Sequence, residues 1–370
     1  MVYMGDAMGV PNPFPILEQE PLLYCTAVYA CTIHQTIEQI QRSVRTYMPR
    51  TYDRYLNNDV IVLSDANKDA FRHDHFSWMK DGVLEEGQGL VMIGGAESFA
   101  EIGGYASWKP TGVADILPCE MILSALTFSG GTIRVLDWED EFIDSLPFES
   151  IGAYGHFHSS NNIQPRSRAN YIAELVKGTM GTLPFLMWWD IGEGRTMAQS
   201  ADWTPAGGSQ FMTWRYYGDY CINMMMFLAG QKLPDDLETV YMVRRKIRET
   251  NEGLSTLYSM VDIVERFGGS GNTLNQLIQD IQVEKQEALG LYMRAELADA
   301  LEAFDICLEM CEDTMDEAIE IRDAAAFWVF FTEWCAVTGT AMFAGSLLWF
   351  LMIKRRLYRE VAYTRLRQAE

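Results

Sequence analysis

A run of 20 residues without a charged side chain, from Trp334 to Ile353, constrains this chain more than any other feature. An α-helix needs about 20 mainly apolar residues to cross the hydrocarbon core of a bilayer. Three basic residues follow at once, at 354–356, as they do on the cytoplasmic flank of a membrane helix. The run predicts one transmembrane helix over 326–353 and a basic tail over 354–370. The alternative is a buried core helix of a soluble protein.

The same charge pattern predicts a topology. The positive-inside rule places the C-terminus in the cytoplasm and residues 1–325 outside it, with the bilayer as the first partner of the chain. A large amino-terminal domain needs an export signal to cross, and Met1–Asp6 read as a short strand and turn, without the basic and apolar regions of a signal peptide. Either an export segment precedes the sequence given, which we favour, or the domain is cytoplasmic and the charge rule fails.

The net charge and the cysteine pattern limit which classes of partner and cofactor this chain can bind. The net charge of −22 lacks the positive footprint of nucleic-acid binding, so we expect no nucleic-acid partner. The seven cysteines include no CxxC pair, and Cys307 and Cys311 lie one helical turn apart. We interpret the cysteines as buried or helix-face thiols, and we expect neither a metal nor another cofactor.

Residues 233–325 have the pattern of a helical stalk. Apolar residues recur mostly at steps of three and four, and the run breaks once, at Gly268–Asn272. The pattern predicts an antiparallel hairpin of two long helices with coiled-coil-like packing, whose acidic residues form the solvated face. From Leu301 onward the apolar pattern continues with a shifted phase. A stalk of this kind makes a homo-oligomer or a protein partner plausible.

Residues 1–232 alternate short apolar runs with amphipathic segments, which is typical of an α/β domain. Asp59–Asp65 and Gly89–Gly95 are strong buried-strand signals, and a helical segment over 68–86 separates them. This spacing predicts a parallel βαβ unit. Further predicted strands cover 22–30, 132–136, 183–189 and 195–200.

Two motifs carry a family resemblance. Residues 87–120 contain GQGLVMIGGAESFAEIGGY followed by Trp108, and residues 192–220 contain GEGRTMAQSADWTP followed by Trp214. Both resemble the glutamine amidotransferase-like domain of prokaryotic membrane-associated proteins, a branch of the class I glutamine amidotransferase-like superfamily. The basic tail is similar to that of single-pass archaeal membrane proteins. The resemblance implies a flavodoxin-like fold, a mostly parallel sheet flanked by helices, with ligands bound at the carboxyl ends of the strands.

The resemblance also implies a chemistry that this sequence lacks. A glutaminase needs a cysteine on a strand-to-helix turn and a histidine that activates it. The equivalent turn, Gly94–Ser98, contains no cysteine, and Ala206 follows Asp202–Pro205 where a histidine would be needed. We therefore assign no catalytic residue and expect no glutaminase activity.

A ligand site remains predicted at the strand ends. Its candidate residues are Asp65, Gly94, Gly95, Glu97, Ser98, His156, His158, Asp202 and Trp203. Most of them have a simpler explanation. The glycines permit tight turns, Glu97 is a solvated loop carboxylate, Ser98 is a helix N-cap, and Asp202 and Trp203 are structural residues at a strand end.

The histidines are a weaker case. His156 and His158 lie two apart, so on a strand they would face one side and share a metal, with Asp202 as a candidate third ligand. We favour loop histidines without metal. His73 and His75 begin a predicted helix and are expected at the surface.

Three functions stay open at this point. The first is a non-catalytic, membrane-anchored binding or scaffolding protein, in effect a pseudoenzyme. The second is a divergent hydrolase or amidotransferase-like enzyme that uses a site without cysteine. The third is a structural assembly subunit that acts through the stalk, which exposed apolar stripes on the stalk would favour.

Overall fold

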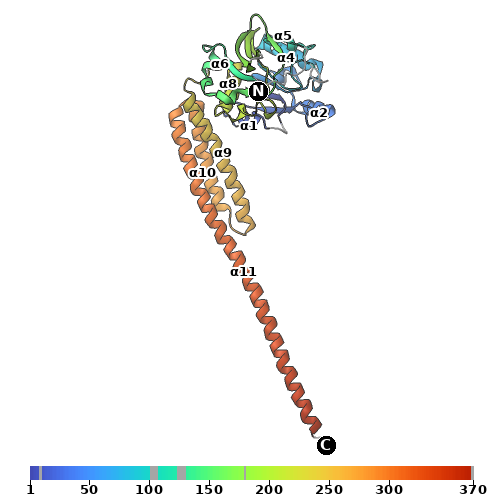
Figure 1. Cartoon of the computed structure of the whole chain (residues 1–370). Coiled ribbons are helices and arrows are strands. Elements are labelled where there is room, and N and C mark those ends of the chain that lie inside the picture. Colours follow the sequence, from blue (N-terminus) through green and yellow to red (C-terminus); the bar gives the residue numbers. More distant parts are fainter. Residues whose placement is uncertain (8–10, 101–106, 123–130, 179–180, 368–370) are drawn as a thin grey trace. The chain divides into compact units, whose positions relative to one another are not determined.

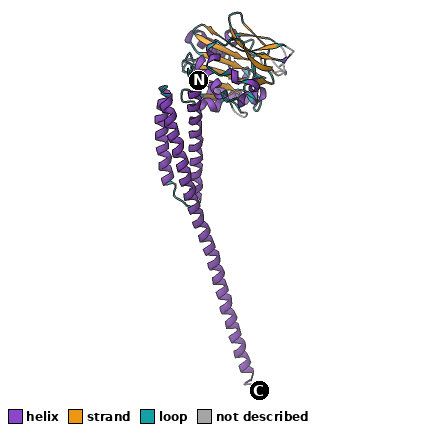
Figure 2. Ribbon diagram, turned by 60° about the vertical axis from the view of Figure 1, so that its left-hand side comes forward, coloured by secondary structure: helices purple, strands orange, loops and turns teal. Residues whose placement is uncertain are grey.

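The computed structural model describes residues 1–7, 11–100, 107–122, 131–178 and 181–367. The chain divides into two compact units, Met1–Arg244 and Arg245–Glu370. The strands lie in the first unit, and the second is helical (Figure 2). This division confirms an α/β domain followed by a helical stalk.

The described part of the first unit contains one nine-stranded sheet in the order β2-β1-β3-β4-β11-β10-β9-β6-β7. The strands are β1 Val2–Gly5, β2 Thr26–Tyr29, β3 Val60–Ser64, β4 Gly89–Ile93, β6 Gly131–Val135, β7 His156–Phe157, β9 Asn170–Val176, β10 Thr182–Ile191 and β11 Gly194–Gln199. From β2 to β11 neighbours are parallel, and from β11 to β7 they are antiparallel. A separate antiparallel pair joins β5 (Cys119–Met121) to β8 (Ile163–Pro165).

Short helices and turns connect these strands. The helices are α1 Phe14–Glu18, α2 Ile37–Tyr47, α3 Tyr52–Tyr55, α4 His73–Glu86, α5 Val113–Ile116, α6 Glu141–Asp144, α7 Pro205–Gly208 and α8 Tyr217–Leu228. The 3₁₀ turns are η1 Lys68–Ala70, η2 Phe148–Ser150, η3 Gly152–Gly155 and η5 Phe211–Thr213. The strand and helix predictions for this unit are confirmed to within a few residues.

Both faces of the parallel half of the sheet are buried, because alternate residues of each strand enter different cores. Val60 and Val62 of β3 pack into a core with α8, whereas Ile61 and Leu63 pack into a second core with α2 and α4. This explains why β3 reads as a continuous apolar run rather than an alternating one.

The second unit contains α10 (Asn272–Met293) and α11 (Leu297–Arg367), together with most of α9 (Leu237–Arg266). The three helices run side by side (Figure 1). The predicted break at Gly268–Asn272 is confirmed, and Gly268 adopts a φ of +77° there. The stalk has three helices rather than the expected two, because the chain turns again at Arg294–Glu296, where Ala295 has a φ of 59°. The expected second helix is therefore divided into α10 and α11.

The first turns of α9 belong to the first unit and carry a buried ion-pair cluster. Arg244 is 2% exposed; its Nε lies 3.1 Å from Glu20 Oε2 and its Nη1 lies 2.7 Å from Asp219 Oδ1. Nη1 also donates to Asn223 Oδ1 at 3.3 Å. A buried arginine needs such partners, because removing its charge from water is costly.

The bundle of α9, α10 and α11 buries its own apolar stripe. Leu257, Val264, Ile281 and Ala318 are each at most 1% exposed, and they pack into one core. Large exposed hydrophobics in this stretch are scattered singly. The predicted stripe is real, and the neighbouring helices of the same chain cover it.

The part of α11 beyond the bundle is exposed rather than buried. By length and composition, the segment Leu297–Tyr358 includes a stretch that could cross a membrane, and none of that stretch is buried within the structure. Trp334 is 73% exposed and Met342 is 74% exposed. No such helix occurs elsewhere among the described residues.

Candidate functional site

The carboxyl ends of the five parallel strands bring polar residues to one edge of the sheet. Asp6 follows β1, Cys31 follows β2, Asp65 follows β3, and Asp202 follows β11 shortly after the strand ends. The strands approach closely here: a Cβ added to Gly5, whose φ is +128°, would lie 1.8 Å from the Ser64 carbonyl oxygen. We call the residues Asp6, Cys31, Asp65, Glu97 and Asp202 the carboxyl-end cluster.

Glu97 is the hub of this cluster. Its side chain accepts hydrogen bonds from Thr32 N at 2.8 Å, from the Thr32 hydroxyl, and from Asn67 Nδ2 at 3.0 Å. The residue is 1% exposed. The prediction of a solvated loop carboxylate was wrong, because the loops after β2 and β3 fold over it and supply three donors.

Asp65 is hydrogen-bonded to the backbone of Glu97. Its Oδ1 accepts the Glu97 backbone N–H at 2.6 Å, and Cys31 Sγ lies 3.6 Å from its Oδ2. Gly95, with a φ of +153°, leaves room for it, since a Cβ there would lie 2.3 Å from Asp65 Oδ1. Burial, followed by the charge of Asp202, raises the pKa of Asp65 to about 7. Asp65 therefore holds a proton for much of the time at neutral pH.

Asp6 and Asp202 complete the acidic group. Asp202 accepts from Thr204 N and Thr204 Oγ1, each at 2.8 Å, and burial raises its pKa to about 6. Asp6 Oδ1 accepts the Tyr3 hydroxyl at 2.9 Å, whereas its buried Oδ2 has no partner among the described residues. Burial, then Asp202 and then Asp65, raise the pKa of Asp6 well above its usual range. Because these carboxyls interact, they lose their protons in steps that belong to the group rather than to a single residue.

Ser98 and Asn161 fix the turn after β4. Ser98 Oγ donates to the Ile93 carbonyl at 2.6 Å, so its hydroxyl closes the turn instead of capping a helix as predicted. Asn161 holds Gly95 from both sides: its Oδ1 accepts Gly95 N at 2.9 Å, and its Nδ2 donates to Gly95 O at 3.0 Å. Sequence reasoning missed Asn161, because it lies 66 residues away in a loop without a motif.

Trp203 has the structural role expected of it. It is fully buried and stacks on Tyr3 with ring centroids 6.2 Å apart, and its Nε1 donates to Ser64 Oγ at 2.9 Å. It therefore links the ends of β1, β3 and β11.

The histidine pair does not join this cluster. His156 and His158 lie on and beside the edge strand β7, with ring centroids 5.6 Å apart. His158 Nε2 lies 3.1 Å from Ser209 Oγ, and His156 Nδ1 lies 3.4 Å from Thr132 Oγ1. Within the described ranges, no three His, Cys, Asp or Glu side chains gather in a metal-ligating arrangement.

His75 was wrongly predicted at the surface. It is 3% exposed and its ring lies against Trp78, with centroids 5.3 Å apart. Its Nδ1 accepts the Arg72 backbone N–H at 3.3 Å, which places it at the first turn of α4. His73 is exposed, as expected.

Cys31 is the only thiol that the described structure places in the cluster, and sequence reasoning did not single it out. It is 1% exposed, and burial followed by Asp65 raises its pKa. A nucleophilic cysteine needs the opposite, a pKa lowered by a neighbouring cation or base. The signal available was its position, two residues after β2.

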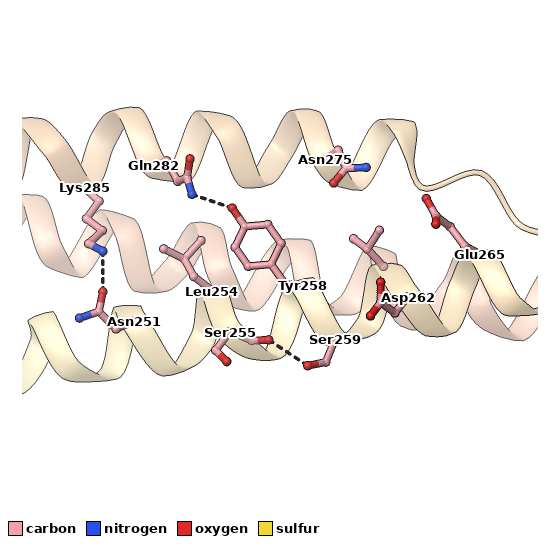
Figure 3. A pocket seen from close by; sticks show the side chains of 11 residues that line it. Asn251, Leu254, Ser255, Tyr258, Ser259, Asp262, Glu265, Asn275, Gln282 and Lys285 are labelled. Atoms are coloured by element: carbon pink, nitrogen blue, oxygen red, sulfur yellow. Dashed lines mark hydrogen bonds between the residues drawn. The ribbon is translucent and has the colours of Figure 1, made fainter. Parts of the chain in front are cut away.

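A second candidate site is a groove of about 710 Å³ in the helical unit (Figure 3). Gln282 of α10 donates to the Tyr258 hydroxyl of α9 at 2.6 Å, and Lys285 Nζ donates to Asn251 Oδ1. These bonds bridge the two helices over the buried Leu254. The polar side chains of Asn251, Tyr258, Gln282 and Lys285 are thus used within the bundle. Among the described lining residues, the groove shows no nucleophile hydrogen-bonded to a base.

The fold and the carboxyl-end cluster define an α/β domain of the flavodoxin-like class, with its polar residues at the carboxyl ends of the parallel strands of a mixed sheet. A protein family described as "Putative glutamine amidotransferase" matches residues 32–230, which is more than half of the chain. The chain belongs to this family.

Two solved structures are similar to this chain at a low level. Two cytoplasmic proteins of Salmonella typhimurium are 21% and 20% identical, with TM-scores of 0.49 and 0.48. Each match covers 61% of this chain and 98% of the Salmonella protein. A search of curated proteins finds no match. At this level of similarity, the Salmonella proteins say nothing about function here.

Proposed function

We propose that this protein is a non-catalytic binding module of the amidotransferase-like family, anchored in a membrane by the apolar half of α11. The observation that supports the non-catalytic part is the carboxyl-end cluster. Where a glutaminase needs a thiolate and a base, this chain has a thiol with a raised pKa beside an aspartate whose pKa is raised to about 7. The charges and hydrogen bonds of the cluster hold loops together rather than activate a nucleophile.

The apolar surface of α11 supports the anchoring part. From Trp334 to Ile353 the helix has no charged residue, and its large side chains are about half or more exposed. Soluble proteins rarely expose continuous apolar patches of more than a few hundred Å². A bilayer removes that surface from water, and the basic residues at 354–356 suit a cytoplasmic flank. In this proposal the C-terminus is cytoplasmic and the α/β domain is extracytoplasmic.

The stalk is the weaker candidate for the main function. Assembly through the stalk would be favoured by a free apolar stripe, and the stripe is instead covered within the bundle of α9, α10 and α11. We propose self-association through polar contacts of the stalk only as a secondary role.

The test of the non-catalytic proposal is a glutaminase assay on the purified full-length chain in detergent, with ammonia release as the readout. We expect no release above the background of a Cys31→Ala control. Release that Cys31→Ala abolishes would show that the buried thiol is activated and would overturn the proposal.

A further inference from the structure

A recess of about 380 Å³ lies between the end of α2 and the beginning of α4, outside the carboxyl-end cluster (both helices are labelled in Figure 1). Val44 and Met48, which are 1% and 3% exposed, contribute apolar surface together with Pro49. A volume of this size falls in the range that holds a small molecule. The apolar lining favours a ligand with an apolar body.

Three arginines line the same recess. Arg45 is at the end of α2, Arg50 follows it, and Arg72 precedes α4. Within the described part of the chain, Arg45 and Arg50 make no ion pair or hydrogen bond through their guanidinium groups, and both residues are exposed. The guanidinium of Arg72 forms one ion pair among the described residues, with Asp74. The distance from Nη2 to Oδ2 is 3.9 Å, and both side chains are exposed. Exposed pairs of this kind are weak, so the third guanidinium is also available.

His75 adds an uncharged donor to the lining. Because its Nδ1 accepts a backbone hydrogen bond, the neutral ring carries its proton on Nε2. Burial, and then the charge of Arg72, lower its pKa to about 4, so the ring is neutral at physiological pH. The recess is therefore lined by three permanently charged arginines and one neutral histidine.

The strongly acidic chain does not cancel this local charge. At physiological ionic strength, exposed charges more than about 8 Å apart are largely screened from one another. A ligand at the recess therefore interacts with the three guanidinium groups more than with the net charge of −22. Guanidinium groups bind phosphate through paired, charge-assisted hydrogen bonds.

We propose that this arginine recess binds a small organic phosphate, with the phosphate on Arg45, Arg50 and Arg72 and the apolar body against Val44, Met48 and Pro49. The inference does not depend on whether the domain is catalytic, because the recess and the carboxyl-end cluster share no residue. It assigns to the domain a ligand class and a place to bind it.

The experiment is isothermal titration of the full-length chain in detergent with phenyl phosphate, inorganic phosphate and phenol. We expect phenyl phosphate to bind more tightly than inorganic phosphate, and phenol not to bind. Replacing one guanidinium, in Arg45→Gln or Arg50→Gln, should weaken phenyl phosphate binding about tenfold, since each substitution removes a charge-assisted contact.

Arg42→Gln is the matched control, because Arg42 is exposed on the same helix and does not line the recess. It should leave binding within about twofold of the unchanged protein, because it removes a neighbouring exposed charge without removing a side chain that lines the recess. Equal losses in Arg42→Gln and Arg45→Gln would show nonspecific attraction and overturn the site. Absence of binding at millimolar phenyl phosphate, or equal binding of benzoate, would overturn the phosphate assignment.

Discussion

The two halves of α11 present the same helix in two environments. In the first half, Phe304 and Cys307 are fully buried in the bundle, whereas in the second half Trp334 and Phe343 are 73% and 70% exposed. The helix is continuous between them. The difference lies in the pattern, since the first half has an apolar stripe and the second is apolar on all sides.

This comparison shows that a helical assignment does not by itself tell which environment a helix occupies. The apolar stripe of the first half is covered by two neighbouring helices, and its polar face is exposed to water. A helix that is apolar all round is buried either in a protein core or in a membrane. The following experiments test this contrast between buried and exposed positions.

The largest effect is expected from charges in the apolar half. The double substitution Phe343→Asp and Leu348→Asp should release the protein from membranes, because each aspartate costs about 2.5–3.5 kcal/mol at the centre of a bilayer-spanning helix. Alkaline extraction and vesicle flotation measure the release. Ile306→Asp is the control: it is exposed in the first half of the same helix and should leave membrane association unchanged. If both variants float equally, the apolar half does not anchor the chain.

The next effect concerns the core of the bundle. Phe304→Ala should lower the local free energy of unfolding by about 3–5 kcal/mol, as expected when a fully buried aromatic side chain leaves a cavity. Hydrogen exchange of the α11 amides in detergent reports the change. Ile306→Ala, two residues along and 44% exposed, should change it by less than about 1 kcal/mol. Similar protection factors in the two variants would contradict the bundle.

Arg244 and Arg245 repeat the contrast in adjacent positions of α9. Arg244→Ala leaves the buried carboxylates of Glu20 and Asp219 without their cation, and should cost about 3–5 kcal/mol of stability. Arg245→Ala removes an exposed pair with Glu249 and should cost under about 1 kcal/mol. Thermal unfolding of the α/β domain compares the two, and equal melting temperatures would refute the assignment of the buried cluster.

The smallest effect is a pH dependence from Asp65. Because its folded pKa is raised to about 7, above the roughly 3.9 of a free aspartate, the folded state binds more protons than the unfolded state between these values. Stability from this group therefore falls as pH rises from about 4 to about 7. His75 acts in the opposite direction between about 4 and 6.5, since its folded pKa is lowered.

The comparison with Asp65→Asn isolates the aspartate, because His75 is common to both proteins. Unfolding measured at pH 5 and pH 7 should show the unsubstituted protein losing about 1–2 kcal/mol relative to Asp65→Asn over this interval. Parallel stability curves for the two proteins would show that Asp65 is ionised throughout.

The sequence predicts the elements better than it predicts the loops. Val60–Ser64 and Gly89–Ile93 are predictable because burial on both faces requires a continuous apolar run. The turn at Arg294–Glu296 has no glycine or proline, and its only trace is the shifted apolar phase after Leu301. A shift of phase alone does not distinguish a break from a continuing helix, so the third helix is not predicted.

The site divides in the same way. The positions of Asp65, Gly95 and Asp202 follow from the strand ends, and the structure brings them together. The environment of Glu97 could not be predicted, because its donors come from Thr32 and Asn67 in loops whose folding depends on long-range contacts. The role of Asn161 could not be predicted either, because its contact with Gly95 is also long-range.

The unbroken course of α11 has a mechanical consequence. A helix advances about 100° per residue, so one residue inserted near Ala325 would turn the bundle by about a quarter turn relative to the apolar half, and seven residues would restore its facing almost fully. The chain contains no hinge in this stretch to absorb such a rotation. The number of residues between the bundle and the apolar half thus sets the rotation of one relative to the other about the axis of α11.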